Sequence, residues 1–119
     1  MKQKEKSLLD ALKKQEITGK ELEELLVARK DNKVSFLLVD VREREEYSIE
    51  KIVGVDLLIP TSEFYLDTKI IEGYKNEAIV LQCRSGARSH SMQQILKNFG
   101  YNNVINLSGG ILDYHGPKN

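Results

Sequence analysis

The chain has 119 residues, enough for one domain with a hydrophobic core and too few for two. Its 18 basic and 18 acidic residues give a formal net charge of zero, so electrostatics favours neither nucleic acid nor an anionic membrane as a partner. The hydrophobic content of 40% is ordinary for a globular protein. No apolar run has the length of a membrane span or a signal peptide, so the cytoplasm is the expected compartment.

Cysteine and histidine are scarce. The single cysteine, Cys83, excludes an internal disulfide and a metal site of the CxxC type. A dyad of Cys83 with His90 would indicate an acyl-transfer nucleophile, but His90 is interpreted as a solvent-facing residue of a helix. His115 falls in a C-terminal segment that is expected to be loose. We therefore expect neither a metal nor a cofactor.

Two amphipathic helices are predicted near the N-terminus. The first lies within Ser7–Gln15, with Ser7 as its N-cap, and belongs to a helical extension over residues 1–16 that precedes a domain over residues 17–119. The second begins at a capping box made by Thr18 and Glu21. Its apolar stripe consists of Leu22, Leu25 and Leu26.

A continuous apolar run over Phe36–Val39 predicts a strand that is covered on both faces of a parallel sheet. Asp40 then stands at the carboxyl end of this strand, where open α/β sheets bind their ligands. In the alternative interpretation Asp40 only caps the next turn and Arg42 pairs with Glu46. Asp40 and Arg42 are candidates for a supporting role behind a site.

The middle of the chain predicts a strand followed by irregular structure. Asp56–Ile59 is the predicted strand, and Pro60 fits its end. The following segment, Thr61–Tyr74, is expected to be a loop with a short helix. Its Phe64 and Tyr65 could line the mouth of a site or cover the core, and core cover is the favoured interpretation.

A polar loop joins a predicted strand over residues 78–81 to a predicted helix that begins at Ala87. Cys83 lies at this junction, where backbone amides and the helix dipole can form an anion-binding nest. Gly86 permits the positive φ that such a turn usually requires. The apolar residues that predict the helix are Met92, Ile95, Leu96 and Phe99, and Val104–Leu107 predicts a last strand after it.

A thiol in this position is expected to ionise readily. The pKa of cysteine falls from about 8.5 at a helix N-terminus or beside arginine, and Arg84 and Arg88 would supply both charge and hydrogen-bond donors. A lone cysteine more often only packs in the core. Two arginines and two serines would be costly to bury around a merely structural thiol, so Cys83 is predicted to be a nucleophile.

The loop resembles the active loop of the single-domain rhodanese-like sulfurtransferases. That loop reads Cys-Arg-x-Gly-x-Arg followed by Ser or Thr, and residues 83–89 match it at every position. Related cysteine phosphatases have Cys-x5-Arg, whereas Cys83 and Arg88 are spaced as Cys-x4-Arg. The shorter loop has room for one terminal sulfur atom rather than a phosphate.

The resemblance covers about residues 17–114 and implies an α/β fold, as does the alternation of predicted strands and helices. The expected architecture is a three-layer α/β/α domain with a mainly parallel sheet of four or five strands. The block from Asp40 to Tyr47 is similar to one that supports the active loop in the family. Two departures concern the pocket: Glu50-Lys51 replaces a frequent Gly-His, and Tyr114 stands where a Trp is usual.

The resemblance implies sulfur transfer through a persulfide on Cys83. The donor would be thiosulfate or a polysulfide, and the acceptor cyanide, a thiol or a sulfur-accepting protein. The residues expected to bind the donor are Arg84, Ser85, Gly86, Ala87, Arg88 and Ser89. A non-enzymatic sulfur-relay or binding module is one alternative, and a phosphatase or arsenate reductase is another that the loop spacing disfavours. The physiological donor, the acceptor and the oligomeric state stay open.

Overall fold

The computed structural model describes residues 3–64 and 68–119, which form a parallel sheet with helices on both faces. The five strands of this part of the chain lie in the order β1-β5-β4-β2-β3, and every neighbouring pair is parallel. The predicted three-layer α/β/α fold is confirmed. The strands are β1 (Glu16–Ile17), β2 (Leu37–Asp40), β3 (Leu57–Leu58), β4 (Ile79–Gln82) and β5 (Val104–Leu107).

The helical elements alternate with the strands, as parallel pairing requires. The α-helices are α1 (Gln3–Ala11), α2 (Gly19–Lys30), α3 (Arg44–Ile49) and α5 (Ala87–Asn98), and the short 3₁₀ turns are η1 (Thr61–Glu63), η2 (Thr68–Tyr74) and η3 (Ile111–Asp113). None of the helices in residues 3–64 and 68–119 combines the length and the apolar character needed to cross a bilayer.

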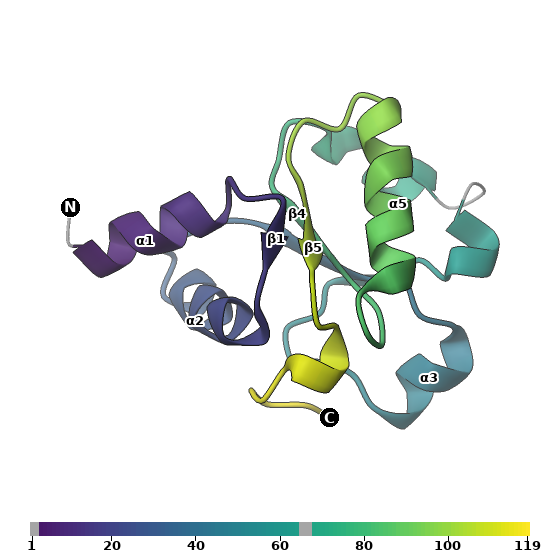
Figure 1. Ribbon diagram of the computed structural model, residues 1–119, viewed down its shortest axis with the longest axis horizontal. Coiled ribbons are helices and arrows are strands. Elements are labelled where there is room, and N and C mark those ends of the chain that lie inside the picture. Colours follow the sequence, from purple (N-terminus) through teal and green to yellow (C-terminus); the bar gives the residue numbers. More distant parts are fainter. Residues whose placement is uncertain (1–2, 65–67) are drawn as a thin grey trace.

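Each face of the sheet has its own hydrophobic core, because successive side chains of a strand point to opposite faces. Figure 1 shows α1 and α2 on one side of the strands and α5 on the other. Leu38 and Val80 belong to the core that contains the apolar residues of α1 and α2. Val39 and Leu81 belong to the core that contains those of α5. The central strands β2 and β4 are therefore apolar on both faces, which explains their unbroken hydrophobic runs.

The first helix is displaced from its predicted position. Helix α1 begins at Gln3 and ends at Ala11, so Ser7 lies inside the helix and the predicted N-cap at Ser7 is wrong. The Lys- and Glu-rich residues before Ser7 are good helix formers, so the helix can begin earlier. Leu8 and Ala11 are buried in the same hydrophobic core as the apolar residues of α2, and this packing fixes the position of the helix.

Helix α2 begins as its sequence predicts. The Thr18 hydroxyl accepts a hydrogen bond from the Glu21 amide at 3.1 Å, and the Glu21 carboxylate accepts one from the Thr18 amide at 3.0 Å. This reciprocal capping box satisfies two amides that would otherwise lack partners. The helix ends at Lys30, and Asn32 takes a positive φ of 60° in the turn that follows.

Among the remaining predicted elements, β2 and β4 lie one residue later than predicted and β3 is shorter. Strand β3 is shorter than predicted because only Leu57 and Leu58 pair with β2. Phe64 is 1% exposed, which confirms that it covers the core, whereas Tyr65 lies outside the described residues. Strand β5 has its predicted bounds, and Gly100 takes a positive φ of 89° after α5.

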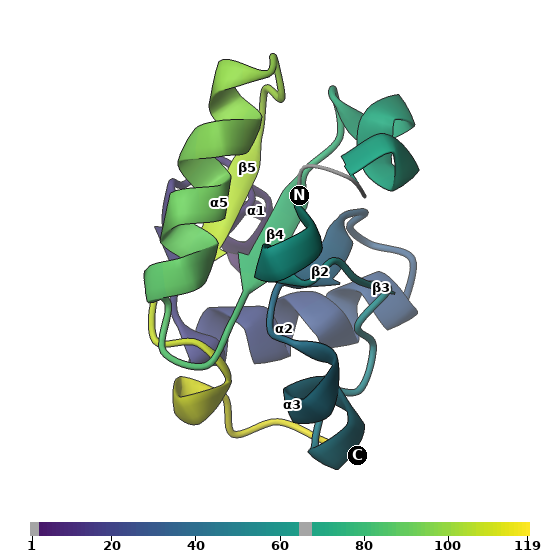
Figure 2. The ribbon, with the colours of Figure 1, turned by 90° about the vertical axis from the view of Figure 1, so that its right-hand side faces the viewer.

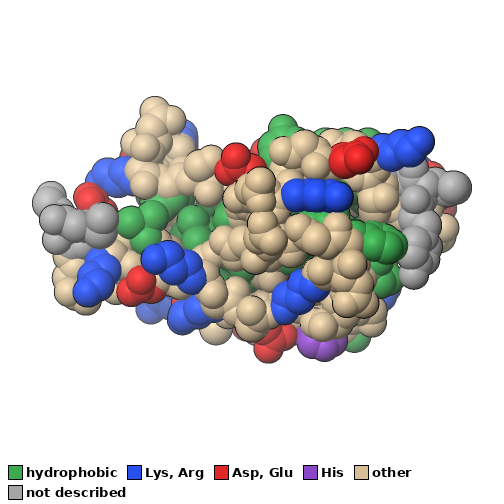
Figure 3. Space-filling view, turned by 90° about the horizontal axis from the view of Figure 1, so that it is seen from above, with side chains coloured by type: hydrophobic (Ala, Val, Ile, Leu, Met, Phe, Trp, Pro, Cys, Tyr) green, Lys and Arg blue, Asp and Glu red, His purple; other side chains and the backbone are tan. Residues whose placement is uncertain are grey.

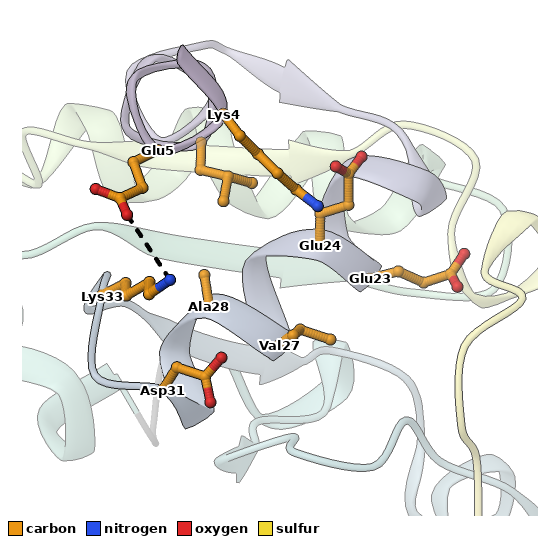
Figure 4. Close-up of a pocket in the computed structure, with 9 residues that line it drawn as sticks. Lys4, Glu5, Glu23, Glu24, Val27, Ala28, Asp31 and Lys33 are labelled. Carbon is orange, nitrogen blue, oxygen red and sulfur yellow. Dashed lines mark ion pairs between the residues drawn. The ribbon is translucent and has the colours of Figure 1, made fainter. Parts of the chain in front are cut away.

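A groove with a volume of about 450 Å³ lies between α1 and α2. Figure 4 shows charged side chains from both helices around it, with Val27 and Ala28 along α2. Lys33 and Glu5 approach within 3.7 Å across the groove. Its lining residues include no nucleophile and no loop residue from 83–89, so it is not the site that the sequence predicts.

Substitutions on the two faces of α2 are expected to separate core packing from helix propensity. Leu25 is fully buried and Val27 is 64% exposed on the same helix. We expect Leu25→Ala to lower the free energy of unfolding by about 2–5 kcal/mol, because it removes buried methyl groups and leaves a cavity. Val27→Ala should change it by less than about 0.5 kcal/mol. Urea denaturation followed by circular dichroism measures both, and equal losses would contradict this packing.

Candidate active site

The predicted nucleophile lies at the carboxyl edge of the sheet. Cys83 directly follows β4, and Asp40 ends the neighbouring strand β2. Figures 1 and 2 both show α3, η3 and the first turn of α5 gathered at this end of the sheet. Segments that are far apart in sequence therefore surround the loop between β4 and α5.

The loop is packed closely against the turn that follows β5. The amide of Ile111 donates to the Cys83 carbonyl at 2.9 Å, and the amide of Leu112 donates to the Arg84 carbonyl at 3.1 Å. Gly86 has a φ of +102°, and a Cβ at this position would lie 2.1 Å from the Ser108 carbonyl oxygen. Gly86 is thus required both by its backbone conformation and by the lack of space.

Backbone amides converge on the sulfur of Cys83. The Gly86 amide donates to Sγ at 3.1 Å and the Ser89 amide at 3.5 Å, while the Ser89 hydroxyl lies 3.4 Å away. The thiol is 1% exposed, and this burial raises its pKa. Hydrogen bonds from Ser89, Gly86 and Ser85 lower it by more, so the pKa of Cys83 falls below its ordinary value.

Three acceptors compete for the Ser89 hydroxyl: the Cys83 sulfur, the Asn106 side chain and the Gly86 carbonyl, which lies 3.3 Å away. The hydroxyl lies 2.5 Å from the Asn106 Oδ1 and 3.4 Å from the Cys83 sulfur, and it has only one proton to donate. Asn106 in turn donates to Glu16 at 3.1 Å and to the Gly86 carbonyl at 3.2 Å. A charged sulfur is a stronger acceptor than an amide oxygen, so the hydroxyl stabilises the thiolate more than the thiol. Asn106 could not be identified from the sequence, because one Asn in an apolar strand carries no motif.

Neither arginine of the loop donates a hydrogen bond to the thiol, although the charge of Cys83 contributes to the raised pKa of Arg88. Arg88 makes a bidentate ion pair with Glu46 of α3, with N–O distances of 2.7 and 2.9 Å. The side chain of Arg84 is exposed and has no hydrogen bond to Cys83 within the part of the chain that the structure describes. The donors that lower the pKa of Cys83 are therefore the Ser89 hydroxyl and the backbone amides of Ser89, Gly86 and Ser85, and the charge of Arg88 is paired with Glu46.

Asp40 and Arg42 form a buried ion pair beside the loop. Arg42 donates to both carboxylate oxygens of Asp40 at 2.8–3.1 Å and to the Glu50 carbonyl at 2.6 Å. Asp40 also accepts from the Arg42 amide at 2.9 Å and so caps the turn. The alternative pairing of Arg42 with Glu46 is wrong, since Glu46 binds Arg88 instead. Only the backbone of Glu50 is used, so this contact does not depend on the missing Gly-His.

The other candidate residues named from the sequence differ in their exposure to solvent. Ser85 and Ala87 are exposed on the loop, whereas Gly86 and Ser89 are buried. His90 is exposed, as interpreted from the sequence. Tyr114 is 1% exposed and fills the position of the usual Trp as a core residue. No group of three or more His, Cys, Asp or Glu side chains suited to a metal ion occurs in residues 3–64 and 68–119.

The fold and the loop together define a class: an α/β domain with a thiol held by amides between a strand and a helix. The sequence model of one family, described as "Rhodanese-like domain", matches residues 18–116. The chain belongs to this family. Helix α1 lies before the matched residues, although its apolar side chains are part of the core.

Relatives and solved structures agree with this assignment. A Bacillus subtilis protein named as a candidate sulfur carrier, YrkF, is 36% identical over 86 residues, which are 72% of this chain and 45% of the relative. The chain thus spans less than half the length of this relative and of several others. An Allochromatium vinosum protein named sulfurtransferase is 36% identical over 76 residues, or 64% of this chain and 68% of that protein.

The fold matches the crystal structure of a rhodanese-like domain protein from Staphylococcus aureus. The TM-score is 0.70 at 25% identity, over 85% of this chain and 91% of that one. The chain therefore corresponds to nearly the whole of that structure.

Removal of the Ser89 hydroxyl should raise the pKa of Cys83. Ser89→Ala deletes a donor to the thiolate and leaves both backbone amides in place. We expect the thiolate absorbance of the variant to appear at higher pH than in the wild type. Ser91→Ala is the matched control, because the Ser91 hydroxyl on the same helix donates to the Ala87 carbonyl. An unchanged titration in Ser89→Ala would show that the hydroxyl donates to the Asn106 side chain or the Gly86 carbonyl and not to the sulfur.

The ion pair between Glu46 and Arg88 should make stability depend on pH in the acid range. The hydrogen bonds from Arg88 lower the pKa of Glu46 from 4.5 to about 2. Because the folded state binds this proton less tightly, the pair stabilises the fold above pH 4.5, and the contribution is lost as the pH falls toward 2.

Glu46→Gln cannot ionise and should lack this part of the pH dependence. Urea denaturation of the wild type and the variant between about pH 7 and pH 3 measures the difference in stability. The two curves should converge as the pH falls. Parallel curves over the whole range would contradict the bidentate pair in solution.

Proposed function

We propose that this domain is a sulfurtransferase that carries sulfane sulfur as a persulfide on Cys83. The observation that carries the proposal is the convergence of the Gly86 and Ser89 amides on the Cys83 sulfur, which lowers its pKa. A thiolate is the nucleophilic form of cysteine, and only a nucleophile can take sulfur from a donor. Relatives named as a candidate sulfur carrier and as a sulfurtransferase support the same chemistry.

The first step is attack of the Cys83 thiolate on the outer sulfur of the donor. With thiosulfate, the new bond joins the Cys83 sulfur to the sulfane sulfur, and the S–S bond of thiosulfate breaks to release sulfite. The three negative charges of the reactants are carried by the cysteine persulfide and the sulfite dianion. Since sulfite and a shortened polysulfide are stable anions, the leaving group needs no general acid.

The loop is suited to hold the negative charge of the outer sulfur. Amides that face a buried anion act in a water-poor environment and need no reorganisation during the reaction. The helix dipole of α5 adds to this effect, because the loop ends at the N-terminus of a 12-residue helix. In the proposal, residues 84–89 bind the donor, and the exposed Arg84, Ser85 and Ala87 are those that it meets first.

Several acceptors fit the second half of the reaction. Cyanide or a thiol would attack the outer sulfur of the persulfide and regenerate the Cys83 thiolate. A protein acceptor would make the domain a sulfur relay, and the relative named as a candidate sulfur carrier favours this variant. The reducing cytoplasm suits a protein whose single thiol must stay free.

Mass spectrometry of the whole protein after incubation with thiosulfate or polysulfide tests the proposal. We expect Cys83 to gain the mass of one sulfur atom, a reductant to remove it, and cyanide to release thiocyanate. Cys83→Ser should show none of these reactions while it keeps the circular dichroism of the wild type. A wild-type protein that gains no sulfur from either donor, or that hydrolyses an aryl phosphate through Cys83, would overturn the assignment.

If sulfur loads but turnover with small thiols is slow, the relay variant is favoured. Stoichiometric transfer from the loaded protein to a co-purified acceptor protein would then identify the domain as a sulfur relay.

A further inference from the structure

The charge around the thiol differs from what the loop sequence suggests. Two arginines in the loop indicate a cationic mouth that attracts a dianion such as thiosulfate. In the structure, the two guanidinium nitrogens of Arg88 bind the two carboxylate oxygens of Glu46 at 2.7 and 2.9 Å. The side chains of Arg88 and Glu46 are only 34% and 31% exposed, so solvent screens the pair incompletely. One of the two positive charges is therefore cancelled beside the thiol.

A second carboxylate strengthens this cancellation. The pKa of Arg88 is raised mainly by Glu46, then by the charge of Cys83, and then by Glu43, the residue before α3. Other basic side chains nearby are also paired: Arg42 is bound to Asp40, and Arg44 is bound to Glu63 at 3.0 Å. Figure 3 views the molecule from the end opposite α3 and the thiol loop, where acidic and basic side chains are also interspersed.

The donors that face the sulfur are neutral groups. Amides of Gly86 and Ser89 contact Sγ directly, and the side chain of Arg84 lies at the exposed surface of the loop. Amides and a helix dipole stabilise one negative charge well. A second and third negative charge, as thiosulfate brings, would need cations beside the thiol. Arg84 is exposed and donates no hydrogen bond to the sulfur, and Glu46 binds the guanidinium of Arg88.

We infer that Glu46 is a specificity-determining residue that makes this site prefer sulfur donors with a single negative charge, such as organic persulfides, over dianionic thiosulfate. The inference rests on the proposed function and names its donor class. Glu46 acts through Arg88 and does not touch the reacting sulfur.

The favoured reaction conserves atoms and charge. The Cys83 thiolate attacks the outer sulfur of an organic persulfide anion, R–S–S⁻. The S–S bond of the donor breaks, the thiolate R–S⁻ leaves, and Cys83 becomes the persulfide anion. Two negative charges enter and two remain, one fewer than with thiosulfate.

The test compares two donors with wild-type protein and two variants. The donors are thiosulfate and the persulfide of 2-mercaptoethanol, whose only charge is on sulfur. Glu46→Gln removes the charge but keeps an oxygen that can accept from Arg88. Glu45→Gln is the matched control, since it makes the same change of charge at an exposed position of α3 that does not bind Arg88.

In Glu46→Gln, kcat/KM for thiosulfate should rise about tenfold relative to kcat/KM for the persulfide. Glu45→Gln should change this ratio by less than about twofold, because an exposed charge is screened. An unchanged ratio in Glu46→Gln, or equal losses with both donors, would overturn the inference. If neither donor loads Cys83 in the wild type, the proposed function itself is wrong.

The salt dependence of the wild type gives a second test that needs no variant. If the positive and negative side chains around the thiol cancel, kcat/KM for thiosulfate should change less than about twofold between low and high ionic strength. A steep fall with added salt would show that a net positive charge attracts the dianion, and would overturn the inference even if Glu46→Gln does not fold.

Discussion

The close contact between the thiol loop and the turn after β5 is the constraint on which the site depends. Gly86 lies against the Ser108 carbonyl, and the amides of Ile111 and Leu112 hold the carbonyls of Cys83 and Arg84. With those carbonyls turned to the C-terminal turn, the amides of the loop point inward to the sulfur. Two strand ends that are neighbours in the sheet thereby place one cradle of amides around the sulfur.

Arg42 and Arg88 both form ion pairs that stabilise this end of the molecule, but they differ in burial. Arg42 is buried and ties Asp40 to the Glu50 carbonyl, so it joins β2 to the segment after α3. Arg88 lies nearer the surface and links the start of α5 to α3 through Glu46. Both guanidinium groups are used to assemble the walls of the site. The charge available to a substrate is consequently smaller than the composition of the loop suggests.

Local patterns in the sequence were sufficient for most of the fold. The capping box at Thr18 located the start of α2, and the apolar run before Asp40 identified a central strand, because both signals depend on neighbouring residues. The start of α1 was misplaced, since Lys- and Glu-rich residues form a helix without a distinctive cap. Asn106 and Glu46 were not recognised as partners of Ser89 and Arg88, because those contacts join distant segments.

The sequence by itself determined the alternation of strands and helices and the position of Cys83 at a strand-to-helix junction. These features follow from spacing along the chain, which local sterics and burial convert into structure. Only the tertiary structure decided which groups surround the sulfur and which carboxylate neutralises Arg88. A hydrogen bond between residues 42 positions apart, as between Glu46 and Arg88, depends on how the elements pack, and no local pattern encodes that packing.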